Sequence, residues 1–276
     1  MMKAIFAPPP GAAYANLLRL ARTTALWLAS PFDAIVRGMA GKPAVPPLWL
    51  RRHAGPVAGF ESSARDMAAF LDRLGVLEES DDVLDIGCGV GSMIPEIAAR
   101  LGPGRRYVGF DVHAPSIRWC QKRFRSDSRL HFELALVASP YGRRYGEPVA
   151  SYRFPVEDAF AGLVLAKSVF THLFEQDARA YLSEIRRALK PGRAAVVTAF
   201  LFDGDKESAP VVRAFPFGDG RVRWRSELRP TAAISYARSV FFGMVRESGL
   251  RVQWMSPGYF PGTDRLTGQD ILLLGH

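Results

Sequence analysis

The chain has 276 residues, a hydrophobic content of 48% and a formal net charge of +9, which suits one large domain with a smaller extension. Its two cysteines, Cys88 and Cys120, exclude a disulfide framework and a cysteine cluster for zinc, so we expect a reducing, cytoplasmic compartment. The charge comes from arginines spread along the chain, which is typical of a solvated surface; attraction of an anionic partner is the alternative.

The N-terminal segment 12–30 predicts a helix that ends near Ser30-Pro31, because proline ends the helix that precedes it. Arg19 and Arg22 interrupt the apolar run, so it fits neither a membrane span nor a signal peptide. Two interpretations remain. The helix packs on the main domain, which we favour, or it is amphipathic and makes a peripheral membrane contact with Trp27 at the interface.

Prolines at positions 43, 46 and 47 predict a linker, so we expect an N-terminal extension over residues 1–59 and a main domain over residues 60–276. The main domain begins with a predicted helix from Phe60 to Leu74, whose apolar residues recur at helical spacing. Its position directly before the first strand favours a lid over the ligand end of a sheet.

From Asp82 onwards, apolar strands alternate with helices, which predicts an α/β, Rossmann-like, doubly wound and mostly parallel sheet. An insertion at about 202–234 breaks the pattern and is the natural place for acceptor specificity. The expected strands are 83–86, 107–111, 130–136, 163–166, 194–200, 250–255 and 269–274, and the expected helices are 92–101, 114–124, 177–189 and 237–248.

A glycine turn follows the first strand, with Gly87, Gly89 and Gly91 at alternate positions. Glycine lets such a turn be tight and lets the backbone approach a small ligand closely. A dinucleotide-binding turn has its third glycine three residues after the second, where this chain has Ser92. The spacing therefore favours a turn that approaches an amino acid and a ribose.

The second strand ends in Asp111, about twenty residues after the turn. A carboxylate there can accept hydrogen bonds from both hydroxyls of a ribose, although capping of the following helix is the alternative role.

These runs, VLDIGCGVG and YVGFDV, together with SVFTHL and YLSEIRRALKPGRAAVVTAF, are similar to class I S-adenosylmethionine-dependent methyltransferases over roughly residues 45–276. More narrowly, GFDV with IRWC downstream, YRFPVED, SVFTHL and GQDILLL resemble a bacterial subgroup with no substrate assigned by sequence. The resemblance implies a seven-stranded sheet with an antiparallel last strand, S-adenosylmethionine as cofactor, and methyl transfer as the activity.

The resemblance also implies roles for particular residues. The glycine turn surrounds the methionine half of the cofactor, Asp111 binds its ribose, and Val112 packs on its adenine. Leu136 stands where such enzymes often have an acid, so packing and backbone would hold the adenine there. Ala166 to Ser168 would supply backbone contacts near the sulfonium. The implied cofactor-binding residues are Asp85, Gly87, Cys88, Gly89, Gly91, Asp111, Val112, Leu136, Lys167 and Ser168.

The candidate general base is His172, which directly follows the fourth strand and has an imidazole suited to accept a proton at neutral pH. A histidine that only tethers this loop is the alternative. Tyr236 and Asp203 are further candidates to face the acceptor. We predict methylation of a hydroxyl, or of an amine, on a small-molecule or sugar-like acceptor. The chain lacks an Asn-Pro-Pro-Tyr-type segment, which argues against nucleic acid.

Two rival functions remain. One is a non-catalytic adaptor that keeps the fold and docks on a membrane or partner, although an adaptor has no reason to keep both the glycines and Asp111. The other is a nicotinamide-dependent oxidoreductase, which Ser92 disfavours.

Overall fold

The computed structural model describes residues 12–39, 41, 45–51, 60–76, 82–142, 145–203, 213–258 and 268–276. It divides the chain into two compact units, Met1–Ala58 and Gly59–His276. The structure thus provides a small N-terminal unit and a large unit that holds the sheet.

The first unit contains α1 (Ala12–Met39) and α2 (Leu48–Arg51). The prediction that the first helix ends near Ser30-Pro31 is wrong, because Pro31 lies inside α1. A proline removes one backbone hydrogen bond, and the helix resumes beyond it, where Asp33 and Arg37 form an ion pair at 2.8 Å one turn apart. No helix in the described part of the chain is long and apolar enough to cross a bilayer.

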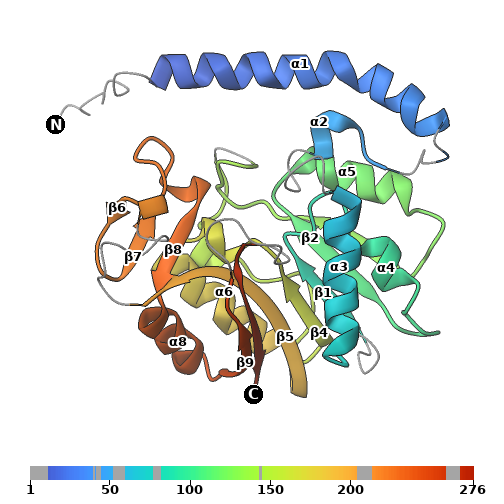
Figure 1. The fold of residues 1–276 in the computed structure, drawn as a ribbon. Helices are drawn as coiled ribbons and strands as arrows, with labels where there is room; N and C mark the ends of the chain where they lie inside the picture. Colours follow the sequence, from blue (N-terminus) through green and yellow to red (C-terminus); the bar gives the residue numbers. More distant parts are fainter. Residues whose placement is uncertain are drawn as a thin grey trace. The chain divides into compact units, whose positions relative to one another are not determined.

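The second unit is built on one mixed sheet in the order β3-β2-β1-β4-β5, with β10 and then β9 on the far side of β5 (Figure 1). β1 to β5 are parallel to one another, and β10 runs antiparallel to β5. The Rossmann-like prediction is confirmed. The strands are β1 (Val83–Ile86), β2 (Tyr107–Asp111), β3 (Leu130–Leu134), β4 (Ala161–Ala166), β5 (Leu189–Phe202), β6 (Phe217–Gly218), β7 (Val222–Trp224), β8 (Ile234–Ala237), β9 (Arg251–Ser256) and β10 (Asp270–Gly275).

Helices cover both faces of this sheet, and each face has its own apolar core. Buried side chains of α3, α4 and α5 make one core, and those of α6 and α8 make the other. The four residues of β1 are buried, as expected of a central parallel strand. The helices are α3 (Phe60–Arg73), α4 (Ile94–Ala98), α5 (Ala114–Arg123), α6 (Glu175–Ala188), α8 (Arg238–Glu247) and the short 3-10 helices η3 (Val149–Ser151), η4 (Phe170–His172) and η5 (Pro230–Ala232).

The helix after the glycine turn is shorter than the predicted 92–101. Gly91 donates its amide to the carbonyl of Cys88, and Ile94 donates to Gly91, so the chain is still turning at Ser92. At the other end the amide of Arg100 reaches the carbonyl of Ile97, three residues back, so the helix closes in a tight turn.

The insertion at 202–234 is more regular than the sequence indicates. β5 continues beyond its pairing with β4, and its residues 200–202 pair in parallel with β8. β7 adds antiparallel to β8, and β6 adds to β7. These strands have two to four residues, too few to give a clear alternation in sequence. Because β4 ends at Ala166 opposite Val197, this extension of the sheet lies beyond the carboxyl end of β4.

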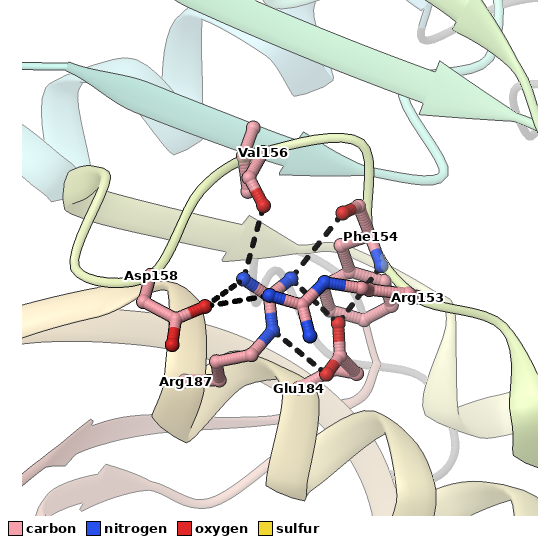
Figure 2. A network of polar contacts seen from close by, with 6 residues as sticks. All are labelled: Arg153, Phe154, Val156, Asp158, Glu184 and Arg187. Atoms are coloured by element: carbon pink, nitrogen blue, oxygen red, sulfur yellow. Dashed lines mark hydrogen bonds and ion pairs between the residues drawn. The ribbon is translucent and has the colours of Figure 1, made fainter.

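A polar network fixes the segment before β4 to α6 (Figure 2). The guanidinium of Arg187 donates to both carboxylate oxygens of Glu184, at 2.8 and 2.7 Å, and to Asp158 at 2.8 Å. It also donates to the carbonyls of Val156 and Phe154, and Glu184 in turn accepts the amide of Phe154 at 2.8 Å. The network lies at the amino end of β4, away from the glycine turn, and its role is structural.

Candidate functional site

The three glycines of the turn after β1 all have positive φ, +68°, +55° and +70°, but their surroundings differ. A Cβ on Gly87 would come within 2.7 Å of the Val169 side chain, and one on Gly91 would come within 2.5 Å of Ile94. A Cβ on Gly89 would meet nothing within 4 Å. Gly87 and Gly91 therefore permit close packing, whereas Gly89 borders open space that a ligand can enter.

Asp111, at the end of β2, holds this turn. Its Oδ2 accepts the amide of Gly89 at 2.8 Å, and its Oδ1 accepts the amide of His113 at 2.7 Å. Burial raises the pKa of Asp111, and the two amide hydrogen bonds oppose that rise. A half-buried carboxylate beside the open space at Gly89 fits a ribose, since each oxygen retains acceptor capacity for a hydroxyl.

A second carboxyl group, Asp85 on β1, lies in the same region. It accepts a hydrogen bond from the Tyr107 hydroxyl at 2.7 Å. Burial, against the opposing hydrogen bond from Tyr107, raises the pKa of Asp85 to about 7; the charge of Asp111 contributes to this rise and Lys167 opposes it. Two acidic groups in a buried region favour a ligand that brings positive charge, as an ammonium or a sulfonium does.

Lys167, directly after β4, donates from Nζ to the Ser63 hydroxyl on α3 at 3.0 Å. Burial lowers the pKa of Lys167, and the charges of Asp85 and Asp66 oppose that shift. The contact ties the first turn of α3 to the carboxyl end of β4, where a lid was expected from the sequence.

Ser168 has a left-handed backbone, with φ of +61°, which is costly for a residue other than glycine. Its amide donates to the Thr198 hydroxyl at 2.7 Å, and the Thr198 hydroxyl donates to Gln269. Gln269 closes the ring by donating to the Ser168 hydroxyl at 2.9 Å. Both backbone groups of Ser168 thus have partners in the protein, because the Thr171 hydroxyl also donates to its carbonyl oxygen at 3.0 Å.

Gln269 did not emerge as a site residue from the sequence. The available signal was a polar residue directly before the last apolar strand, which antiparallel pairing places beside β5.

The residues expected around an adenine lie at the ends of β2 and β3. Leu136 exposes 46% of its surface, which provides an apolar face for a planar ring. Val112 is half-buried, and a Cβ on Gly142 would approach its carbonyl oxygen within 2.3 Å, so the loop after β3 packs against it. Cys88 is buried and burial raises its thiol pKa well above the usual range, which fits a packing residue rather than a nucleophile.

The candidate base His172 lies in η4. Its Nδ1 is 2.9 Å from the carbonyl oxygen of Thr231, and since a carbonyl only accepts, Nδ1 carries the proton. The neutral ring then has its lone pair on Nε2, which makes no hydrogen bond to any described residue. Burial lowers the pKa of His172, with the Thr231 contact opposing it.

Tyr141 and Thr231 complete this arrangement, and sequence reasoning missed both. The Tyr141 hydroxyl lies 3.2 Å from His172 Nδ1 and 3.4 Å from the Thr231 carbonyl, and the two rings are 4.8 Å apart between centroids. Tyr141 comes from the loop after β3 and Thr231 from η5 in the insertion. No sequence pattern links three such distant segments.

The expectation that Tyr236 faces the acceptor is wrong. Tyr236 is fully buried, and its hydroxyl donates to the carbonyls of Phe170, at 2.8 Å, and Leu173. Tyr236 of β8 therefore fixes the backbone of η4 at both of its ends. Asp203 forms an ion pair with Arg238 at 2.7 Å, and most of its side chain is exposed.

Comparisons with known proteins show which family and fold the chain resembles. Residues 83–192 match a family model described as a methyltransferase domain. The mRNA cap guanine-N(7) methyltransferase of Saccharomyces cerevisiae is 29% identical over 116 residues, which are 41% of this chain and 26% of that protein. The chain spans less than half the length of the curated relatives it matches.

Solved structures share the fold. The mitomycin 7-O-methyltransferase has a TM-score of 0.52 at 18% identity, over 91% of this chain and 60% of that chain. The 1,6-didemethyltoxoflavin-N1-methyltransferase of Burkholderia thailandensis, solved with 1,6-didemethyltoxoflavin and S-adenosylhomocysteine, has a TM-score of 0.51 at 17% identity, over 99% and 91% of the two chains.

The family match begins at β1 and extends to residue 192, so it includes the glycine turn, Asp111 and His172. The open space at Gly89 beside the half-buried carboxylate of Asp111 fits the nucleoside of S-adenosylmethionine. Residues 83–192 therefore form a methyltransferase domain, and the fold is that of solved S-adenosylmethionine-dependent methyltransferases.

Proposed function

We propose that the protein methylates a hydroxyl, or an amine, of a small-molecule or sugar-like acceptor. The observation that carries this proposal is the hydrogen bonding of His172, which puts the proton on Nδ1 and leaves Nε2 as a proton acceptor. A base is useful when the acceptor atom must lose a proton, as a hydroxyl or an ammonium does. The names of the two solved relatives, a 7-O- and an N1-methyltransferase, support the same acceptor class.

The residues at the carboxyl ends of β1 and β2 would bind and orient the cofactor, which supplies a methyl group on a sulfonium. Asp111 would hold the ribose, and Asp85 would favour the positive charge of the methionine half. The left-handed turn at Ser168, held by Thr198 and Gln269, would fix the backbone beside the reacting atoms. Displacement at a methyl carbon depends on such alignment, so rigid support is a large part of what the protein contributes.

On the acceptor side, His172 would take the proton at Nε2. Because burial lowers its pKa, the imidazole is neutral at pH 7 and ready to accept. The Nδ1–H donated to Thr231 fixes the tautomer. Since Thr231 belongs to the insertion, the segment that we expect to set acceptor specificity also contacts the candidate base.

Transfer of a radioactive methyl group into a cell lysate tests the proposal. We expect label in the small-molecule fraction, and label confined to protein or RNA, or absent from all fractions, contradicts it.

The matched variants are His172→Asn and Tyr141→Phe. Asn retains a donor for the Thr231 carbonyl but cannot accept the proton, so the turnover rate should fall by about a hundredfold or more while S-adenosylhomocysteine binds as before. Tyr141→Phe retains the ring contact and should reduce turnover far less. A turnover rate that survives His172→Asn would assign His172 to loop tethering.

A further inference from the structure

The exposed side of α1 is apolar. Five of its side chains recur three or four residues apart between positions 28 and 39, which places them along one side of the helix. Each of these residues exposes between 61 and 86% of its surface, so no described part of the N-terminal unit covers them. We call this set the apolar stripe, and its residues are Leu28, Phe32, Ile35, Val36 and Met39.

The opposite side of α1 is polar and already has partners. At 100° per residue, Asp33 and Arg37 lie across the helix from the apolar stripe. Asp33 is ion-paired with Arg37 at 2.8 Å and with Arg51 of α2, and Arg37 also donates to the carbonyl of Val45. The polar side therefore holds the N-terminal unit together, and the apolar stripe takes no part in that contact.

The N-terminal unit also carries most of the net charge of the chain. Residues 1–58 contain seven Lys and Arg residues and one acidic residue, which leaves +6 of the total of +9. Residues 59–276 are nearly balanced, with 29 basic and 26 acidic residues. The single acid of the N-terminal unit is Asp33, which its two arginine partners neutralise.

We propose that α1 docks on an anionic lipid surface, with the apolar stripe inserted among the acyl chains near the headgroups. An amphipathic helix in a basic segment gains from both burial of its apolar side and attraction to anionic lipids. A second copy of the chain is a poorer occupant, because pairing through α1 would bring two units of +6 together. The docking requires neither cofactor nor acceptor, so it stands apart from the proposed function.

Flotation of the full-length protein with vesicles tests the docking. With equal parts phosphatidylcholine and phosphatidylglycerol at 0.1 M salt, the protein should float with the lipid. Pure phosphatidylcholine, or 0.5 M salt, should reduce the bound fraction at least tenfold, because the charge attraction is lost or screened. Equal binding to both lipid mixtures, or none to the anionic one, overturns the proposal.

The double variant Phe32→Ser with Ile35→Ser should bind the anionic vesicles at least tenfold more weakly. Both side chains are exposed, so folding and S-adenosylhomocysteine binding should be unchanged. The matched control, Phe217→Ser with Leu228→Ser, removes exposed apolar side chains from the second unit and should float like the wild type.

Light scattering separates the remaining occupants. A dimer that the double variant dissociates, without vesicle binding by the wild type, identifies a second copy as the partner and overturns lipid docking. A variant with weakened cofactor binding, such as Asp111→Asn, should still float, so failure of either proposal leaves the other intact.

Discussion

Replacing Asp111 with Asn tests where the ribose lies. In the structure each carboxylate oxygen accepts one backbone amide, Oδ2 from Gly89 and Oδ1 from His113. Asn has the same shape and retains one acceptor oxygen, but its amide group replaces the other. One backbone amide then faces a donor, and one ribose hydroxyl loses a charged acceptor.

The two losses have separate magnitudes. A hydrogen bond to a charged group is worth about 1.5–3 kcal/mol, which corresponds to a roughly ten- to 150-fold weaker affinity for S-adenosylhomocysteine. The unpaired amide of Gly89 or His113 lowers the free energy of unfolding by about 1–3 kcal/mol whether or not ligand is present.

Calorimetric titration of S-adenosylhomocysteine measures the affinity, and urea unfolding of the same samples corrects for any unfolded fraction. Asp127→Asn is the matched control. Asp127 is ion-paired with Arg129 before β3, at the edge of the sheet away from the glycine turn, so its loss should not change the affinity. An affinity unchanged by Asp111→Asn in folded protein would mean that Asp111 does not hold the ribose.

Two further predictions concern stability. Arg187→Ala should lower the free energy of unfolding by about 3 kcal/mol, because it leaves the mostly buried Glu184 without its partner. Arg153→Ala, in the same network but 66% exposed, should change it by less than about 0.5 kcal/mol; equal effects in urea unfolding would contradict this. The raised pKa of Asp85 means that the folded chain keeps a proton that the unfolded chain releases near pH 4. Its free energy of unfolding should therefore fall as pH rises from about 4 to about 7, and a fall of the same size in Asp85→Asn would refute the assignment.

The cofactor side of the site could be predicted because its requirements are local. Gly87, Gly89 and Gly91 must adopt positive φ within one turn, and glycine is the residue that does so without strain. Asp111 ends the next strand, and parallel neighbours bring their carboxyl ends to one edge. The first strand, the glycine turn and Asp111 therefore predicted that the ligand lies at the carboxyl edge of the parallel strands, and they predicted which residues meet there.

The N-terminal unit and the insertion could not be predicted in the same way. Proline is a strong helix breaker on average, yet α1 passes through Pro31 because contacts beyond it stabilise the last two turns. β6, β7 and β8 are too short for a periodic signal, and they form because the end of β5 offers them an edge. In both cases a contact distant in sequence outweighed the local preference.

The structure explains why residues 168–173, the SVFTHL motif, have this sequence. Ser168 needs its partners Thr198 and Gln269 to hold a left-handed turn, and Thr171 donates back to the Ser168 carbonyl at 3.0 Å. The side chain of Val169 fills the space that a Cβ on Gly87 would need, so the motif and the glycine turn pack against each other.

The same run connects the two halves of the proposed reaction. Ser168 is fixed from the β5 and β10 side, beside the expected cofactor, and four residues later His172 is fixed by Thr231 of the insertion. Tyr236 holds the carbonyls of Phe170 and Leu173 from behind, so η4 has little freedom to move alone. A change in the insertion that shifts Thr231 should therefore alter the tautomer and position of the base before it alters cofactor binding. Substitutions in residues 213–234 that change which acceptor is used should accordingly change the turnover rate, while the affinity for S-adenosylhomocysteine stays constant.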